Sequence, residues 1–380
     1  MSNIPKLRFP EFSGEWEEKK LGECLTLLYG KDWKDKSSTK KLYPVLGTGG
    51  VISYIDEFIY DKPCVLIGRK GSINNPVFID KPFWTVDTQF YSEIHEGYSP
   101  KFLYYIFCTE NWSKHDESTG VPSLSAKNVE NTYKHIPSYS EQQKIADFLS
   151  NVDSIITAET KILNTLQKKK KALMQKLFTR QLRFKSDDGT DFPAWEEKKL
   201  GEISSSPKYG LNASGIDYDG EHKYLRITDI DEVTHTFSPE EITTPSEFSD
   251  DYLLEENDIV FARTGASTGK TYLYNPNDGD LYFAGFLIKF HIKDANARFV
   301  FYQTCTHEYE KWVHVMSTRS GQPGINSEEY STLKIKLPCI EEQEKIADCL
   351  SIIDSLIQTQ QKVVTTWQQR KKALLQQMFV

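Results

Sequence analysis

The sequence predicts an α+β protein in which two mixed globular blocks are separated by a long antiparallel coiled coil of two duplicated helices. A repeat is the main reason. The eight residues 16–23 recur unchanged at 195–202, and residues 141–178 align without a gap to 342–379 with 20 identical positions. Because a solenoid repeat spans only about 20–50 residues, a duplication of this size indicates two copies of a whole unit, related by an approximate two-fold symmetry.

The two long repeated segments are predicted to be helices. Both lack Gly and Pro, and their apolar residues recur with the seven-residue spacing that favours coiled-coil pairing. A 38-residue helix extends about 57 Å, which is longer than a single domain usually buries. The predicted seam residues are Ile145, Leu149, Val152, Ile156, Leu166, Leu173, Ile346, Leu350, Ile353, Ile357, Trp367 and Leu374.

Chain direction favours antiparallel pairing of these helices. The first helix carries the chain from one block to the next, and the second starts where the second block ends. Antiparallel packing then returns Val380 to the first block. Polar residues interrupt the seam beyond each helix start, so we expect the packing there to be looser or polar. The alternative is that each helix packs only on its own block.

The boundaries follow from the repeat. We assign residues 1–138 and 181–338 to the two blocks, and 139–180 and 339–380 to the helices. Within the blocks, apolar runs predict strands at 65–67, 86–90, 259–261 and 286–290, and short helices at 102–107 and 299–302.

The composition is that of a folded cytoplasmic protein. The chain has 380 residues, of which 38 % are hydrophobic and 13 % aromatic, too many for a disordered chain. No apolar run approaches the roughly 18 residues of a membrane span, and the N-terminus lacks a secretory signal. Six scattered cysteines without a C-x-x-C pair are typical of a reducing compartment.

Net charge argues against a simple nucleic-acid binder. The formal net charge is −8, and residues 181–340 hold 16 Lys and Arg against 27 Asp and Glu, a net of −11. A nucleic-acid-binding protein is expected to show a basic footprint. Any contact with phosphates must therefore rest on locally clustered cations.

Three loop regions are candidates for such contacts. Arg69 and Arg263 each end a predicted strand two residues before a Gly, where guanidinium and backbone N–H groups suit phosphates or base edges. Segments 118–125 and 319–326 keep Gly and Pro in the same places but differ in side chains. Segment 31–41 is rich in Lys and hydroxyls. Each region has an alternative. The arginine loops could be turns whose Arg pairs with an acid, the Gly-Pro segments could be plain linkers into the helices, and segment 31–41 could be a solvated loop.

Catalytic patterns are lacking. Segment 265–271 resembles a phosphate-binding loop, but only three residues separate its glycines where four are needed. No His, Cys, Asp or Glu spacing suggests a metal site, and the tetrapeptide of adenine methyltransferases is absent. We expect no chemistry in this chain, with an ATPase that uses 265–271 as the weakened alternative.

The chain has the order block, helix, block, helix, and the two helices carry related residues at 142–153 and 343–354. This organisation resembles the specificity subunit of a type I restriction–modification enzyme. The resemblance covers nearly the whole chain. It implies that each block is a target-recognition domain reading one half of a bipartite double-stranded DNA site. It also implies that the helices set the spacing and dock two methylation subunits, and that restriction (motor–nuclease) subunits join the complex.

The resemblance assigns S-adenosylmethionine, ATP and Mg²⁺ to the partner subunits, with no cofactor and no metal in this chain. Unlike blocks imply unlike half-sites. The rival interpretation is a coiled-coil scaffold with two protein-binding ends. Mapped on this chain, the candidate DNA contacts are Lys31, Lys34, Arg69, Lys70, Ser123, Ser125, Lys127, Arg263, Thr264, Ser267, Lys270, Arg319, Gln322 and Asn326.

Overall fold

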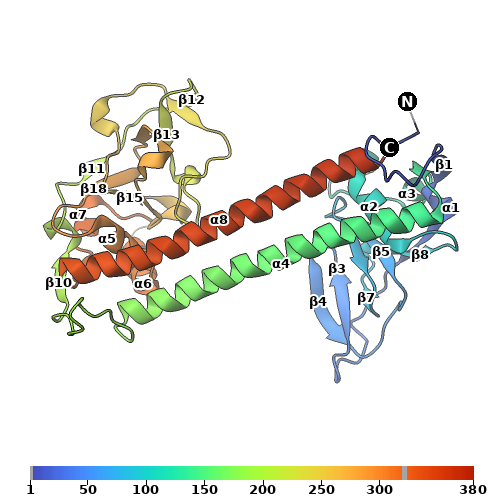
Figure 1. The fold of residues 1–380 in the computed structure, drawn as a ribbon, viewed down its shortest axis with the longest axis horizontal. Coiled ribbons are helices and arrows are strands. Elements are labelled where there is room, and N and C mark those ends of the chain that lie inside the picture. The colour runs from blue at the N-terminus through green and yellow to red at the C-terminus, as the bar shows by residue number, and fades with distance from the viewer. Residues whose placement is uncertain (1–2, 319–322) are drawn as a thin grey trace. The chain divides into compact units, whose positions relative to one another are not determined.

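The computed structural model describes residues 3–318 and 323–380, which form two compact units (Figure 1). One unit comprises Met1–Ile162 and Gln360–Val380, and the other comprises Leu163–Thr359. Each unit holds one block together with a part of both long helices, α4 (Tyr139–Phe178) and α8 (Ile340–Met378).

The first block is built on strands that are antiparallel except for the parallel pair β3 and β7. Its strands are β1 (Glu17–Lys20), β2 (Leu25–Tyr29), β3 (Tyr43–Gly47), β4 (Gly50–Ile55), β5 (Cys64–Gly68), β6 (Val77–Ile79), β7 (Trp84–Thr85), β8 (Gln89–Ile94) and β9 (Tyr133–Ile136). They form a four-stranded sheet of order β2-β8-β5-β6, a three-stranded sheet of order β4-β3-β7 and the pair β1-β9. The short helices are α1 (Leu21–Cys24), α2 (Pro100–Thr109) and α3 (Ala126–Glu130).

The second block repeats this plan. Its strands are β10 (Glu196–Lys199), β11 (Lys208–Tyr209), β12 (Gly215–Asp217), β13 (Lys223–Leu225), β14 (Thr243–Pro245), β15 (Asp258–Ala262), β16 (Thr271–Leu273), β17 (Leu281–Phe283), β18 (Leu287–His291) and β19 (Lys334–Leu337). The main sheet has the order β11-β18-β15-β16, and the pairs are β10-β19, β13-β17 and β12-β14. The helices are α5 (Ala297–Gln303), α6 (His307–Ser317) and α7 (Ser327–Ser331).

The duplication is visible in the order of the strands. Both main sheets place the most buried strand, β5 or β15, between a hairpin partner and a strand from later in the chain. The predicted strands at 65–67 and 259–261 are these two, and the helices at 102–107 and 299–302 lie within α2 and α5. The strand predicted at 286–290 is β18, starting one residue later. The prediction for 86–90 is wrong in its first half, because Gln89 N–H donates to Val86 C=O and turns the chain from β7 into β8.

The two long helices pack together in both units. In the first unit, Ile145 and Leu149 of α4 share one core with Met378 of α8. In the second unit, Met174 and Leu177 of α4 share a core with Ile346 and Leu350 of α8. Each block thus buries the start of its own helix and the end of the other, so the helices are antiparallel, as predicted. The alternative in which each helix packs only on its own block is excluded.

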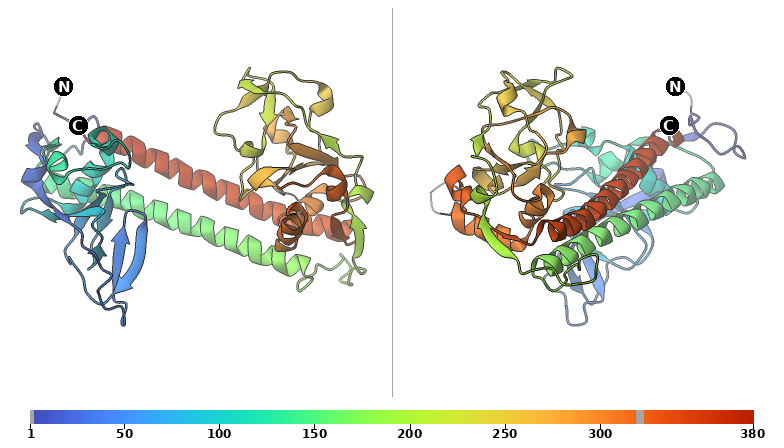
Figure 2. Two further views of the ribbon diagram at one scale, coloured as in Figure 1. Left: turned by 180° about the vertical axis from the view of Figure 1, so that it is seen from behind. Right: turned by 60° about the vertical axis from the view of Figure 1, so that its left-hand side comes forward.

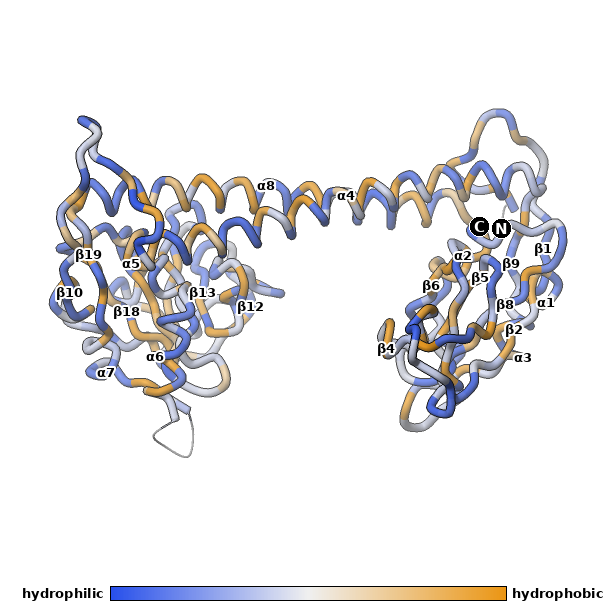
Figure 3. The backbone as a smooth tube through the Cα atoms, turned by 90° about the horizontal axis from the view of Figure 1, so that it is seen from below, coloured by the Kyte–Doolittle hydropathy of each residue, from blue (hydrophilic) through white to orange (hydrophobic). Residues whose placement is uncertain are grey.

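The chain ends return to the first block. Leu7 N–H donates to Gln377 C=O at 2.9 Å, and the ring of Phe379 stacks on Phe102 with 5.5 Å between centroids. Figures 1 and 2 show the carboxyl-terminal part of α8 beside the amino-terminal part of α4 in this unit. Both helices alternate between hydrophobic and hydrophilic residues along their length (Figure 3).

Burial along the seam falls into two groups. The fully buried predicted residues are Ile145, Leu149, Val152, Ile346, Leu350 and Ile357. The half-buried ones are Ile156, Leu166, Leu173, Ile353, Trp367 and Leu374. All twelve therefore lie on packed faces of the two helices.

Polar contacts replace apolar ones further along the seam, which confirms that prediction. In the first unit Asp153 pairs with Lys371 at 2.6 Å and accepts a hydrogen bond from Tyr105 at 2.8 Å. The second unit repeats this with Asp354, which pairs with Lys170 at 2.6 Å and accepts from Tyr302 at 2.7 Å. In each unit one Asp, one Lys and one Tyr form such a cluster. Because the Asp and the Lys lie on different helices, the ion pair forms only in one register of the two helices.

Two further features bear on the sequence predictions. All six cysteines are free, and burial raises the pKa of Cys24 to about 11 and that of Cys64 to about 12, so both thiols are unreactive near neutral pH. Among the described residues, no helix combines the length and the apolarity that crossing a bilayer would require.

Candidate nucleic-acid interface

In the first block the arginine after β5 is held by backbone and ring contacts. Arg69 N–H donates to Thr88 C=O at 2.8 Å, and its Nη1 donates to Asp87 C=O at 3.1 Å. The guanidinium lies over the ring of Tyr29, 5.4 Å from the centroid. A guanidinium has five N–H donors, so most of them remain available to a ligand. These contacts fix the orientation of the Arg69 guanidinium in the free protein.

A second loop closes over the first. Gly71 N–H donates to Pro122 C=O at 2.8 Å, and Leu124 N–H donates to Arg69 C=O at 2.9 Å. Lys70 and Ser123 face each other across this bridge. The strand-end loop and the Gly-Pro loop, which the sequence offered as separate candidates, therefore form one surface.

The second block places its arginine in the same way. Arg263 N–H donates to Phe286 C=O and its Nε donates to Gly285 C=O, both at 3.0 Å. The guanidinium lies over the ring of Tyr209 at 5.1 Å and near the ring of Phe286 at 5.9 Å. Here two rings flank the cation, where the first block offers one.

The Gly-Pro loop of the second block also meets its strand-end loop. Gly265 N–H donates to Pro323 C=O at 3.1 Å, and Ile325 N–H donates to Arg263 C=O at 2.9 Å. Each of these contacts has its counterpart in the first block. One backbone frame is thus built twice.

A glycine after each tyrosine permits this frame. A Cβ at Gly30 would lie 2.1 Å from Val86 O, and a Cβ at Gly210 would lie 2.2 Å from Ala284 O. Both oxygens belong to the backbone and cannot yield as a side chain can. The close approach brings the strand that carries the tyrosine against the turn that holds the arginine.

Two predicted contacts are engaged as helix caps. Ser125 Oγ accepts from Asn128 N–H at 3.2 Å at the start of α3, and Asn326 Oδ1 accepts from Glu329 N–H at 2.9 Å at the start of α7. Their equivalent places confirm that the loops share a frame. Each cap uses one acceptor position of the side chain, so contact of these residues with DNA stays a prediction.

The remaining predicted contacts lie in these loops or in the short helical segments that follow them. Ser123 N–H donates to Asp116 Oδ1 at 2.9 Å, and this hydrogen bond is the largest cause of the lowered pKa of Asp116. Thr264 bridges to the Gly-Pro loop, Ser267 ends a short 3₁₀ turn, and Lys127 is exposed on α3. Arg319 and Gln322 lie outside the described residues.

The two lysines next to these loops differ. Lys70 is exposed beside Arg69. Lys270 has an 11 % exposed side chain, and its Nζ donates to Ile230 C=O at 3.0 Å and lies 3.5 Å from Glu232. We therefore leave Lys270 out of the proposed interface, since its ammonium already has partners within the block.

The lysine-rich segment is ordered and exposed. Asp32 Oδ1 accepts from Trp33 N–H at 2.7 Å and Lys34 N–H at 3.2 Å, which forms a tight turn. The side chains of Lys31 and Lys34 are exposed, and within residues 3–318 and 323–380 neither forms an ion pair. Contact of these two lysines with DNA stays a prediction.

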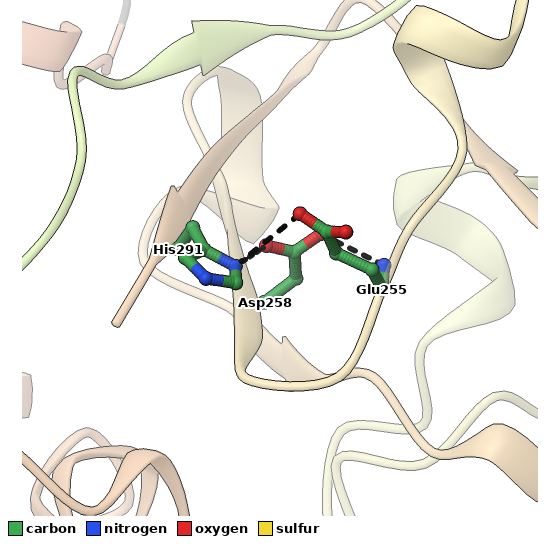
Figure 4. Close-up of side chains that lie close together, drawn as sticks. All are labelled: Glu255, Asp258 and His291. Atoms are coloured by element: carbon green, nitrogen blue, oxygen red, sulfur yellow. Dashed lines mark hydrogen bonds and ion pairs between the residues drawn. The ribbon is translucent and has the colours of Figure 1, made fainter. Parts of the chain in front are cut away.

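One cluster has the side chains of a metal site but the contacts of an ion-pair network. Glu255, Asp258 and His291 converge between β15 and β18 (Figure 4). The Asp258 carboxylate is fully buried and accepts from His291 Nδ1 at 2.9 Å and Glu255 N–H at 2.9 Å, with Lys289 Nζ at 3.1 Å. The Asp258 carboxylate already has the Lys289 ammonium as its counter-charge. The cluster therefore ties two strands together.

Sequence reasoning missed Tyr29 and Tyr209. A signal was present, because each copy has a Tyr-Gly pair, at 29–30 and 209–210. Each ring meets an arginine 40 or 54 positions away, which neither a local pattern nor a helical period predicts.

The fold and the site together define a class: a duplicated recognition protein, with two copies of one loop frame that carry unlike side chains. The family model of the type I restriction modification DNA specificity domain matches residues 13–168 and 194–366. The chain therefore belongs to this family of DNA specificity domains.

Similar proteins agree with this assignment. The type I restriction enzyme MjaVIII specificity subunit of Methanocaldococcus jannaschii is 27 % identical over 402 residues, covering 97 % of this chain and 92 % of that protein. The crystal structure of a type I restriction–modification S subunit from M. genitalium matches with a TM-score of 0.66 and 16 % identity over 99 % of both chains. A chain from a study of complex assembly in a type I R-M system matches with a TM-score of 0.52 and 16 % identity over 95 % of this chain and 96 % of that one. These two structures support the fold.

Proposed function

We propose that this chain is the DNA-recognition subunit of a type I restriction–modification enzyme and that each block reads one half of an asymmetric bipartite site. Family membership supports the general role. One observation carries the finer statement: the frame around Arg69 recurs around Arg263, while the side chains that it presents differ. A shared frame with unlike side chains suits two readers of unlike base sequences.

The chain acts in this proposal without catalysis of its own. Methyl transfer from S-adenosylmethionine and ATP- and Mg²⁺-dependent cleavage belong to partner subunits in the cytoplasm. Two methylation subunits and the restriction subunits complete the assembly. The relative from the assembly study supports a multi-subunit complex of this kind.

The paired helices offer a surface for such a partner. A groove of about 550 Å³ on the first unit is lined by Phe148, Val152, Ile155, Trp367, Ala373 and Leu374, among others. Phe148 and Ile155 are each 36 % exposed. An apolar groove rimmed by polar residues is typical of a protein contact, and we assign it to a methylation subunit.

Net acidity sets a further expectation. The net charge of −8 opposes the approach of a polyanion, so the isolated chain should bind DNA weakly. We propose that the partner subunits supply much of the phosphate contact. A gel-shift assay that found tight, sequence-specific binding by the chain alone would contradict this.

The decisive experiment is to co-express the chain with its methylation subunit and map methylated adenines in the host DNA. We expect one asymmetric motif of two specified halves with a fixed spacer. Arg263→Ala should broaden one half and leave the other unchanged. A protein-binding scaffold predicts no motif, and an ATPase predicts ATP hydrolysis by the purified chain.

A further inference from the structure

The first block carries an exposed apolar ribbon that the recognition loops do not explain. The hairpin formed by β3 and β4 projects from the block (Figure 1). Val51 and Ile52 near its tip are 53 % and 54 % exposed, and Tyr54 is 46 % exposed. Exposed aliphatic side chains side by side on an edge strand need a binding partner to explain them.

The hairpin is continuous with the surface around Arg69. Leu46 C=O, near the end of β3, accepts from Val86 N–H at 3.2 Å. A Cβ at Gly47 would lie 3.5 Å from Ile52 Cγ2 and 3.9 Å from Val86 Cγ2, so these residues are close neighbours. Val86 precedes Asp87, whose carbonyl holds the Arg69 guanidinium. The base of the hairpin therefore lies next to the turn that holds the arginine.

Cations lie at the base of the same hairpin. The Asp56 carboxylate accepts from Ser37 Oγ at 2.7 Å and from the N–H groups of Lys40 and Lys41 at 2.8 Å, which orders the loop before β3. The ammonium groups of both lysines are exposed, and no ion pair involves them in the described part of the chain. The hairpin thus has a basic base and an apolar tip.

These features fit DNA better than a protein strand. A bulge between Val45 and Leu46 leaves Ile52 without a partner in the register, which breaks the regular edge that an added strand needs. The major groove, about 12 Å wide, admits a two-stranded ribbon. At about 3.3 Å per residue, a strand of five residues is about 16 Å long, which is more than the depth of the groove, about 8.5 Å.

We infer that the β3–β4 hairpin enters the major groove of the first half-site and that Val51 and Ile52 contact the methyl group of a thymine there. The inference rests on the proposed function. Thymine is the one base that presents a methyl group in the major groove, and aliphatic side chains are its natural partners. The second block lacks an equivalent, because β13, which pairs with β17 as β3 pairs with β7, has no hairpin partner within the described residues.

The test uses the complex of the full chain with its methylation subunit and duplexes that carry the mapped motif. Each thymine in and beside the half-site that Arg69→Ala broadens is replaced in turn by deoxyuracil, which lacks only the methyl group. At one position kcat/KM for methyl transfer should fall about fourfold, the effect of losing one buried methyl contact.

Variants then assign that methyl group to the hairpin. Val51→Ser/Ile52→Ser should lower the rate on thymine DNA by a similar factor and abolish the difference between thymine and deoxyuracil. Val77→Ser, which changes a 39 % exposed valine on the other sheet, should keep the difference.

Several outcomes would overturn the inference. One is that no position responds to deoxyuracil, or that this half-site and its flanks hold no thymine. Another is that the double variant slows methylation equally on both DNAs and weakens co-purification with the methylation subunit, which would make the hairpin a protein contact. Failure of the proposed function looks different, because wild-type complex would then produce no motif.

Discussion

The two blocks share a frame and differ around it. Both set an arginine on a tyrosine at the end of the most buried strand and close a Gly-Pro loop over it. The first block adds the β3–β4 hairpin and an exposed Lys70, while the second adds Phe286 beside its arginine and turns Lys270 inward. The difference shows that backbone hydrogen bonds keep the same loop frame in both blocks, while the side chains around that frame differ.

The largest expected effect concerns the clamp at the start of each long helix. Arg8 pairs with Glu141 and Arg183 pairs with Glu342, in both cases through two hydrogen bonds to a buried carboxylate. Among the described residues, Glu342 has a third donor, Trp195 Nε1 at 3.1 Å, whereas Trp16 Nε1 finds no partner there.

Arg8→Ala should therefore destabilise the first block by about 3 kcal/mol, because it leaves a buried carboxylate unpaired. Arg183→Ala also leaves a buried carboxylate without its counter-charge, but it should cost the second block about 1 kcal/mol less than Arg8→Ala costs the first, since the hydrogen bond from Trp195 remains. Hydrogen exchange of β1 and β10 reports each block separately. The double variant Arg183→Ala/Trp195→Phe should destabilise the second block about as much as Arg8→Ala destabilises the first. Equal losses from the single variants would mean that the tryptophan does not matter.

Next in size is the loss of either arginine. Arg69→Ala and Arg263→Ala should each cost about 1–3 kcal/mol of discrimination, and each at one half of the motif only. Sequencing of methylated sites in cells that express each variant measures this. A variant that broadened both halves would show that the blocks do not read independently.

A smaller effect is expected from the tyrosines that lie against the arginines, and it should differ between the two blocks. Tyr29→Leu removes the single ring under Arg69, and it should weaken discrimination at the first half by about 0.5–1 kcal/mol. Tyr209→Leu should do less, because Phe286 still flanks Arg263. Tyr209→Leu/Phe286→Ser is the matched comparison, and it should equal Tyr29→Leu. Relative kcat/KM on cognate and single-mismatch duplexes gives the values.

The sequence predicted the parts of this molecule that repeat. Duplicated segments and a heptad pattern were enough for the two blocks, the antiparallel helices and the polar stretch of the seam. Arg69 and Arg263 were found because a strand end followed by Gly is visible in both copies. What joins them to Tyr29 and Tyr209 was not visible, since that contact depends on the order of strands in the sheet.

Residue type alone did not predict the local role of the polar side chains. Ser125 and Asn326, predicted as DNA contacts, each cap a helix in the structure, and their contact with DNA stays a prediction. The same oxygen suits either role, so residue type cannot decide between them. The turn at 86–88 was read as a strand because its apolar neighbours hide it, although its carbonyls hold Arg69.

The smallest expected effect is a difference between Lys70 and Lys270 in the salt dependence of DNA binding. Because Lys70 is exposed beside Arg69, Lys70→Gln should remove one phosphate contact and reduce the slope of log affinity against log salt by about 0.9. Lys270→Gln should leave that slope unchanged, because its Nζ already donates to Ile230 C=O and pairs with Glu232. Binding of the assembled complex to its duplex across a salt series measures both. If Lys270→Gln lowers the slope as much as Lys70→Gln, the inward lysine turns out to DNA on binding, and the two peripheries are more alike than the free structure indicates.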